Sequence, residues 1–272
     1  MPLFQKIARE ASGLIGREST LARRLRPAYE SLLDFRGSGI VWEINGETFR
    51  IDPRQRNRLG NNYDAPVAAF LRGRVREGAV CIDVGANVGV YVLQFARWSG
   101  KSGRVIAFEP NPSAVIALKR HIELNDLEDR VTVVPAAVGA SLGEATLYAA
   151  GADSMSRLGE PNRRIAERTV EVRVPVVTLD RFCAAESVVP DWLFMDIEGF
   201  EIAALEGARN LITTRGTDLN IIVEMHPDVW ESADTSCARA EELLAKLRLR
   251  PEPLCGQSDP LAEYGHVHLA HI

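Results

Sequence analysis

Residues able to bind a charged, hydroxyl-bearing ligand follow one apolar run in the first half of this 272-residue chain. Asp83 ends a run that begins at Val80, and Gly85 and Gly89 follow in the pattern D-x-G-x-N-x-G. Glycines at such positions permit a tight turn and a close approach of the backbone to a ligand. Phosphate-binding turns of dinucleotide folds carry three glycines, which keep side chains away from the pyrophosphate. Here an acid and Asn87 stand in the turn, so a ligand with a cation and hydroxyls is favoured. An ordinary glycine turn with a capping Asp is the alternative.

A second acid follows the next apolar run, residues 104–108. Glu109 ends this run, and Pro110 blocks its continuation. An acid at the tip of the second strand, about 20 residues beyond a glycine turn, is the position from which a ribose diol is bound. Two acids at adjacent strand tips therefore predict one ligand that carries a ribose.

Two later apolar runs also end in acids, the first at Asp196 and the second at Glu224. In an open parallel sheet the ligand-binding strand ends share one edge, so Asp83, Glu109, Asp196 and Glu224 should line one crevice. Several like charges are costly to bury together unless a cation, a metal or hydrogen-bond donors meet them.

An acid after a strand can instead cap the following helix, and this alternative exists for each of the four acids singly. Capping is the preferred interpretation for Glu198 and Glu201, which open a helix expected over residues 200–210.

The elements that must position these acids alternate between strand and helix throughout residues 79–249, which predicts one doubly wound α/β domain. The domain is expected over residues 62–272, and residues 1–61 form a cap of amphipathic helices (3–34) and a hairpin. The hairpin joins two short runs through Asn45-Gly46. A membrane-surface or partner helix is the alternative for the basic N-terminal segment.

Four further segments are interpreted from local pattern. Residues 150–168 are polar and turn-rich, which is typical of a surface loop or a lid. Residues 169–177 alternate as a strand, and Pro175 indicates an edge strand. Two short strands are expected at 253–254 and 266–269, with the second at an edge.

Composition narrows the function classes. Apolar residues make up 46% and charged residues 25%, with a net charge of −5 and no basic stripe, so a nucleic-acid partner is not expected. No apolar run reaches the roughly 20 residues of a membrane span. The four cysteines are scattered, which indicates reduced thiols and a cytoplasmic location. The exposed edge of the hairpin at 40–51 would allow pairing into a homodimer.

The chain resembles the FkbM-type family of S-adenosylmethionine-dependent methyltransferases over roughly residues 63–228. The resemblance implies a Rossmann-like methyltransferase fold with a mostly parallel seven-stranded sheet, and methyl transfer to a hydroxyl, often on a sugar or a polyketide. The motifs that carry it are Ile82–Gly89, Phe108–Asn111, Thr178–Asp180 and Asp196–Glu201.

The same resemblance assigns the cofactor residues. The turn from Asp83 to Gly89 would hold the methionine end of S-adenosylmethionine, and Glu109 the ribose hydroxyls. The chain departs from the family at Met195, where a lysine is common, and at Pro135, where a polar residue is common. Backbone groups and apolar packing near Ala136 are therefore expected at the adenine. The predicted set is Asp83, Gly85, Ala86, Asn87, Gly89, Tyr91, Glu109, Pro110 and Ala136.

The predicted catalytic residues are Asp196, Glu224 and His226, at neighbouring strand tips. A neutral histidine or a carboxylate could take the proton of an acceptor hydroxyl. Alternatively, Asp196 and Glu224 could hold a divalent metal such as Mg²⁺ that lowers the pKa of the hydroxyl. The function predicted is O-methylation of a small molecule or sugar, and the alternative is a Rossmann-like binding module without catalysis. An NAD-dependent oxidoreductase fits the glycine spacing badly.

Overall fold

A central seven-stranded sheet organises the protein, for which a computed structural model describes residues 30, 37–162 and 164–272. Its strand order is β12-β13-β11-β10-β3-β4-β5. Only β13 runs antiparallel to its neighbours, so the predicted mostly parallel, seven-stranded sheet is confirmed. The strands are β3 (Val80–Val84), β4 (Arg104–Phe108), β5 (Val131–Val134), β10 (Trp192–Met195), β11 (Asn220–Met225), β12 (Leu249–Pro253) and β13 (Gly265–His271).

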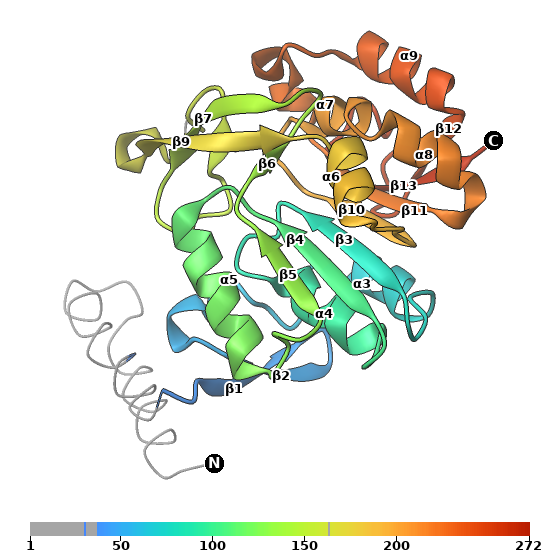
Figure 1. Ribbon diagram of the computed structural model, residues 1–272. Coiled ribbons are helices and arrows are strands. Elements are labelled where there is room, and N and C mark those ends of the chain that lie inside the picture. Colours follow the sequence, from blue (N-terminus) through green and yellow to red (C-terminus); the bar gives the residue numbers. More distant parts are fainter. Residues whose placement is uncertain (1–29, 31–36, 163) are drawn as a thin grey trace.

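Helices cover both faces of this sheet because its central strands are apolar on both sides. Cys81 and Val105 belong to the apolar cluster on one face, and the adjacent residues Ile82 and Ile106 belong to the cluster on the other. The two groups of helices can be followed by colour in Figure 1, the first cyan to green and the second yellow to red. The first group is α3 (Ala65–Arg72), α4 (Val90–Trp98) and α5 (Pro112–Leu124); the second is α6 (Leu179–Glu186), α7 (Glu201–Glu206), α8 (Arg209–Arg215) and α9 (Cys237–Leu247).

The predicted hairpin is confirmed as strands β1 (Ile40–Ile44) and β2 (Glu47–Ile51). Both turn residues, Asn45 and Gly46, have positive φ angles of 50° and 79°, as a two-residue hairpin turn requires. Ile44 and Ile51 are buried in the same apolar cluster as α4 and α5. The boundary between residues 61 and 62 and the homodimer stay predictions, and the helices predicted over 3–34 lie outside the described residues except for Glu30.

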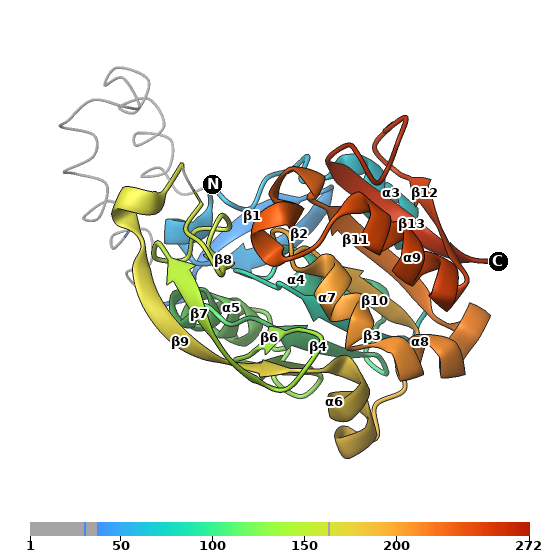
Figure 2. The same ribbon diagram turned by 90° about the horizontal axis from the view of Figure 1, so that it is seen from above.

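A second, four-stranded sheet interrupts the alternation that was expected throughout residues 79–249. Its order is β6-β9-β7-β8, and it lies on the opposite side of the molecule from α9 (Figure 2). Because β8 falls within residues 150–168, this segment is not simply a surface loop. The strands are β6 (Ala137–Val138), β7 (Gly143–Ala149), β8 (Arg157–Leu158) and β9 (Val170–Val177).

Two predicted edge strands lie inside their sheets. Strand β9 lies between β6 and β7, but β6 pairs only with Val176 and Val177. Pro175 is therefore paired with β7 alone and has no partner on the β6 side, so a residue without a backbone N–H is tolerated there. Strand β13 lies between β11 and β12, so the prediction that it forms an edge is wrong.

The single helix expected over residues 200–210 is divided into α7 and α8. Gly207 lies at the break, and a Cβ atom there would come within 2.1 Å of the Gly139 carbonyl oxygen. Short 3₁₀ helices occupy Pro53–Gln55, Ala166–Arg168, Gly216–Asp218 and Pro227–Ala233.

Two findings bear on the predicted location. Within the described part of the chain, none of the helices has the length and apolar character that crossing a membrane requires. Cys81, Cys183, Cys237 and Cys255 are free thiols. The cytoplasmic location stays a prediction.

The Thr178–Asp180 motif has a structural role at the start of α6 and α8. The Thr178 hydroxyl accepts the amide of Arg181 at 3.3 Å, which caps α6. The two carboxylate oxygens of Asp180 accept the amides of Asn210 and Leu211 at 3.0 and 2.8 Å, which fixes the first turn of α8. One acid thus couples two helices on the same face of the sheet.

We expect Asp180→Ala to lower the free energy of unfolding by about 1–2 kcal/mol, because two helix-terminal amides lose their acceptor. Urea unfolding followed by circular dichroism measures the change. The matched control is Glu241→Ala on α9, since Glu241 is exposed and makes no ion pair or hydrogen bond with the described residues. Equal unfolding midpoints for the two variants would contradict the capping role.

Candidate functional site

A cavity of about 570 Å³ opens where the strand order reverses, between β3 and β10. Ligands of open α/β sheets bind at this point, outside the carboxyl ends of the strands. Eight of the nine predicted cofactor residues line the cavity, and Gly89 does not. Gly89 starts α4 with a φ of 95°, and a Cβ atom there would meet Leu118 at 2.6 Å. The eight are Asp83, Gly85, Ala86, Asn87, Tyr91, Glu109, Pro110 and Ala136.

Asp83 contributes a buried carboxylate with an unused oxygen. Its side chain lies in β3, and its Oδ2 atom is buried without a hydrogen-bond partner among the described residues. Burial, and secondarily the charge of Glu109, raise the pKa of Asp83 to about 8. A ligand that donates hydrogen bonds or carries positive charge would satisfy this oxygen.

Gly85 brings the tips of β3 and β10 together. Its φ is 87°, and a Cβ atom at this position would lie 1.9 Å from the carbonyl oxygen of Asp196. Glycine is therefore required both by the backbone conformation and by the close approach.

Glu109 is held in one orientation by two backbone amides. Its Oε2 accepts the amide of Asn87 at 2.7 Å, and its Oε1 accepts the amide of Asn111 at 2.7 Å. Burial raises the pKa of Glu109 to about 7, although the two hydrogen bonds lower it. Each oxygen keeps one lone pair, which suits a pair of adjacent hydroxyls.

The remaining walls come from segments outside the glycine turn. Asn57, Asn62 and Tyr63 line the cavity, as do residues 153–154 and 156–158. The Asn111 side chain donates to the Gly151 carbonyl at 2.7 Å, and Arg58 donates to the Ala152 carbonyl. The turn-rich segment is thus tied to the cavity by two side chains.

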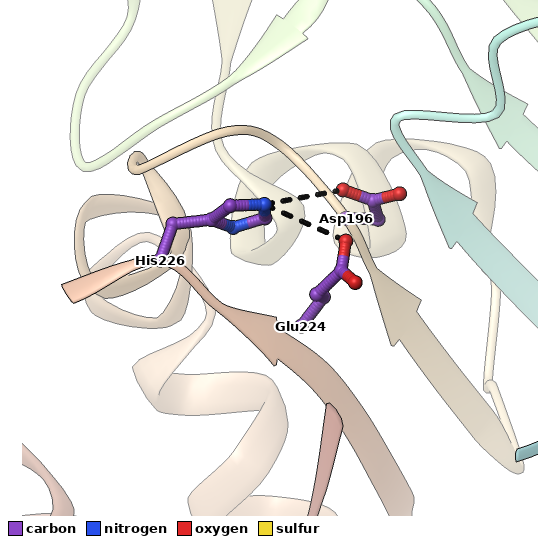
Figure 3. Close-up of side chains that lie close together, drawn as sticks. All are labelled: Asp196, Glu224 and His226. Carbon is purple, nitrogen blue, oxygen red and sulfur yellow. Dashed lines mark ion pairs between the residues drawn. The ribbon is translucent and has the colours of Figure 1, made fainter. Parts of the chain in front are cut away.

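The three predicted catalytic residues lie together (Figure 3). One ligand atom from each of Asp196, Glu224 and His226 lies within 4.8 Å of the others. His226 Nε2 is 3.5 Å from Glu224 Oε2 and 4.0 Å from Asp196 Oδ1. Asp196 lines the cavity, whereas Glu224 and His226 lie beside it.

A fourth carboxylate, Glu201, holds the imidazole from the other side. Its Oε1 lies 2.7 Å from His226 Nδ1 and also accepts the amide of Gly199 at 2.7 Å, and its Oε2 accepts Trp230 Nε1 at 3.0 Å. Glu201 is fully buried. The Gly199 amide precedes α7, and the N-cap residue Phe200 makes no side-chain capping hydrogen bond, so this contact is not the helix cap expected of Glu201. The contact with His226 was not foreseen, since nothing in the spacing joins these residues.

Glu224 is held by residues that the sequence did not indicate. Tyr264 donates to Glu224 Oε1 at 2.6 Å, and His266 Nδ1 lies 3.4 Å from the same oxygen. Glu224 and His266 are directly paired across β11 and β13, which brings His266 to the site. His266 was expected to face solvent or core; it is buried, as the second option had it, but its contact with Glu224 was not foreseen, because it depends on β13 being an inner strand.

The charges of this cluster influence one another strongly. Burial and the neighbouring Glu224 raise the pKa of Asp196. The pKa of Glu224 is lowered, since the charge of His266 and other donors outweigh its burial. Burial lowers the pKa of His226, but Glu201 and the other acids outweigh it and raise the value to about 9. Asp196 is therefore the cluster member that faces the cavity with a high affinity for a proton.

Met195 precedes Asp196 at the end of β10. Its side chain is fully buried in the apolar cluster on the face of α7 and α9. The position contributes packing.

Comparison with known proteins gives one match to a family and one to a curated relative. The family model of the methyltransferase FkbM domain matches residues 83–250. A probable cobalt-precorrin-6B C(15)-methyltransferase (decarboxylating) of Pyrobaculum calidifontis is 30% identical over 157 residues, which is 56% of this chain and 80% of that protein.

Two solved structures are similar at lower identity. The methyltransferase FkbM of Methylobacillus flagellatus has a TM-score of 0.45 and 18% identity over 70% of this chain, which spans 43% of that protein. An O-methyltransferase of Bacillus cereus in complex with SAH has a TM-score of 0.44 and 20% identity, over 75% of this chain and 80% of that one.

The family match includes the glycine turn, Glu109 and the cluster of acids with His226. The cavity-lining residues between 57 and 63, and the Glu224 partners Tyr264 and His266, lie outside it. On this match, the chain belongs to the FkbM family of S-adenosylmethionine-dependent methyltransferases.

Proposed function

We propose that the protein methylates a hydroxyl group of a small molecule or a sugar. The observation that carries this proposal is the position of Asp196, which lines the cavity and belongs to a cluster of acids and histidines beside it. A hydroxyl must lose its proton as its oxygen is methylated, so an O-methyltransferase benefits from a proton acceptor at the acceptor end of its cavity.

The cofactor half of the cavity fits S-adenosylmethionine. The orphaned Asp83 Oδ2 and the two lone pairs of Glu109 offer acceptors for an ammonium group and for ribose hydroxyls. Acidic groups without a basic partner also suit a positively charged sulfonium. When bound, S-adenosylmethionine supplies an electrophilic methyl group, and the C–S electron pair leaves with sulfur.

The chain contributes alignment and a proton acceptor. Tyr91 and Phe194 form one apolar wall of the cavity, with ring centroids 4.1 Å apart. Alignment of the acceptor oxygen with the methyl group and the sulfur accounts for most of the catalysis in such an in-line displacement. The hydroxyl proton passes to Asp196, whose raised pKa favours protonation.

The cavity has further polar side chains besides the proposed cofactor residues. Asn57, Asn62, Ser154 and Arg157 line it, as does Glu198. Amide, hydroxyl and guanidinium groups hydrogen-bond to sugar or polyol hydroxyls, which supports the acceptor class proposed.

We expect S-adenosylhomocysteine to bind the wild-type protein and to bind Glu109→Gln about tenfold or more weakly, because a charged acceptor of two ribose hydroxyls is lost. Isothermal titration calorimetry measures both affinities. Glu241→Gln, on the exposed face of α9, is the matched control and should bind like the wild type. The ribose assignment fails if both variants bind equally well.

Affinity for S-adenosylhomocysteine should rise at least tenfold between pH 6 and pH 8, because Asp83, with a pKa of about 8, gains charge in this range as well as Glu109. Glu109, with a pKa of about 7 in the free protein, is mostly protonated at pH 6 and mostly ionised at pH 8. A ligand that donates hydrogen bonds to the carboxylate favours the ionised form, so binding releases protons. Calorimetry in buffers of different ionisation enthalpy measures this release, and proton uptake would contradict the assignment.

We expect methyl-labelled S-adenosylmethionine to label hydroxyl compounds as alkali-stable methyl ethers, tested with a panel of sugars, glycosides and polyketide alcohols. Glu224→Gln should lower kcat about 10²- to 10⁴-fold, because it disturbs the proton acceptor. Since Glu224 does not line the cavity, affinity for S-adenosylhomocysteine should change little. Labelling only of carbon or nitrogen acceptors would overturn the proposed hydroxyl chemistry.

A further inference from the structure

We propose that Asp196, Glu224 and His226 form a binding site for a divalent transition-metal ion, with Glu201 as a positioning residue behind the histidine. The argument begins with geometry. The three ligand atoms lie within 4.8 Å of one another, and the side chains converge on one point (Figure 3). Ligand atoms about 2.1 Å from a common ion lie roughly 3–4 Å apart, so only a small contraction of the cluster is needed.

Glu201 fixes the orientation of the His226 imidazole and the position of its Nδ1 proton. Glu201 accepts hydrogen bonds from Gly199 and Trp230, so its oxygens act as acceptors and the proton of the imidazole resides on Nδ1. His226 is 5% exposed, and its Nε2 faces Glu224 Oε2 at 3.5 Å and Asp196 Oδ1 at 4.0 Å. A carboxylate that orients a histidine through its far nitrogen is the usual arrangement behind a metal-bound imidazole.

The two oxygens of Glu224 have separate partners. Tyr264 and His266 meet Oε1, which leaves Oε2 directed at His226 Nε2. One carboxylate oxygen is therefore anchored by the protein while the other remains available to an ion.

In the part of the chain that the structure describes, the site has no lysine or arginine to balance its carboxylates. Among the described residues, neither type forms an ion pair with Asp196 or Glu224; the partners of these acids are His226, His266 and Tyr264, and the two acids also interact with each other. Glu198 and Glu201 add negative charge nearby. Buried carboxylates are costly without a cation, and a divalent ion would supply two charges at the centre of the cluster.

The donor set indicates the class of metal. Mg²⁺ and Ca²⁺ prefer oxygen ligands throughout, whereas an imidazole combined with two carboxylates suits Mn²⁺, Fe²⁺, Co²⁺ or Zn²⁺. We therefore assign a transition metal to the site and replace the Mg²⁺ considered from the sequence. Three protein ligands leave positions open on the side of Asp196 that faces the cavity.

The functional consequence, which rests on the proposed O-methylation, is that the ion would hold the acceptor oxygen and lower the pKa of its hydroxyl. The released proton passes to Oδ2 of Asp196, the oxygen that does not face His226. The binding site itself does not depend on the identity of the acceptor.

The test is titration of the chelator-treated, full-length protein with MnCl₂, followed by the electron paramagnetic resonance signal of free Mn²⁺. We expect one site, with affinity at least tenfold weaker in Glu224→Gln and in His226→Gln. Glu201→Gln should weaken binding about 10- to 100-fold while the ligands remain in place. Glu241→Gln on α9 is the control and should bind like the wild type.

A measurement on the wild type alone keeps the proposal testable if a variant fails to fold. Pulsed electron paramagnetic resonance of the Mn²⁺ complex should show coupling to one imidazole nitrogen. Absence of that coupling, or equal Mn²⁺ affinity in the wild type and a folded Glu224→Gln variant, would overturn the metal site. Binding of S-adenosylhomocysteine to the wild type is titrated separately. A wild type that binds S-adenosylhomocysteine but no Mn²⁺ contradicts the metal site, and one that binds Mn²⁺ but no S-adenosylhomocysteine contradicts the proposed function.

Discussion

The free-energy cost of removing carboxylates from water governs how the side chains are arranged at the carboxyl edge of the central sheet. Asp83, Glu109 and Glu224 are almost fully buried there, and Asp196 is partly buried. Backbone amides meet Glu109, a tyrosine hydroxyl and imidazoles meet Glu224, and one oxygen of Asp83 has no partner among the described residues. No lysine or arginine of the described residues forms an ion pair with these acids. Such an edge has spare capacity for hydrogen bonds and positive charge, which the proposed methyl donor, with its sulfonium, ammonium and ribose diol, would use.

Two different solutions to this constraint lie side by side. At β3 and β4, Glu109 is immobilised by two amides of the turns that follow the strands. At β10 and β11, Asp196 and Glu224 are flanked by histidines, and Glu201 fixes one of these from behind. The first arrangement suits recognition of neutral hydroxyls, and the second suits handling of a proton or an ion. The close approach of Gly85 to the Asp196 carbonyl joins the two halves.

Sequence patterns predicted the sheet, the hairpin and the position of Asp83, Glu109 and Asp196 on one cavity, because these features follow from local chemistry. The fourth acid, Glu224, was expected to line the same cavity but lies beside it. An apolar run ending in an acid reports a strand tip, and parallel strand tips share one edge. The contacts made by Glu201 and His266 were missed because they depend on pairing between distant segments. His266 reaches Glu224 only through the antiparallel pairing of β13 with β11, which its alternating pattern could not distinguish from an edge strand. The four-stranded sheet was missed because it also depends on pairing between distant segments. In addition, its strands β6 and β8 are only two residues long.

The wall formed by residues 151–158 has an evolutionary implication. It is fastened to the cavity by Arg58, which precedes the central sheet, and by Asn111, which follows β4. Exchange of the 137–177 insertion together with the 52–63 segment would therefore remodel what the enzyme accepts and leave the cradle of the methyl donor intact, so that relatives could diversify in acceptor while sharing one donor.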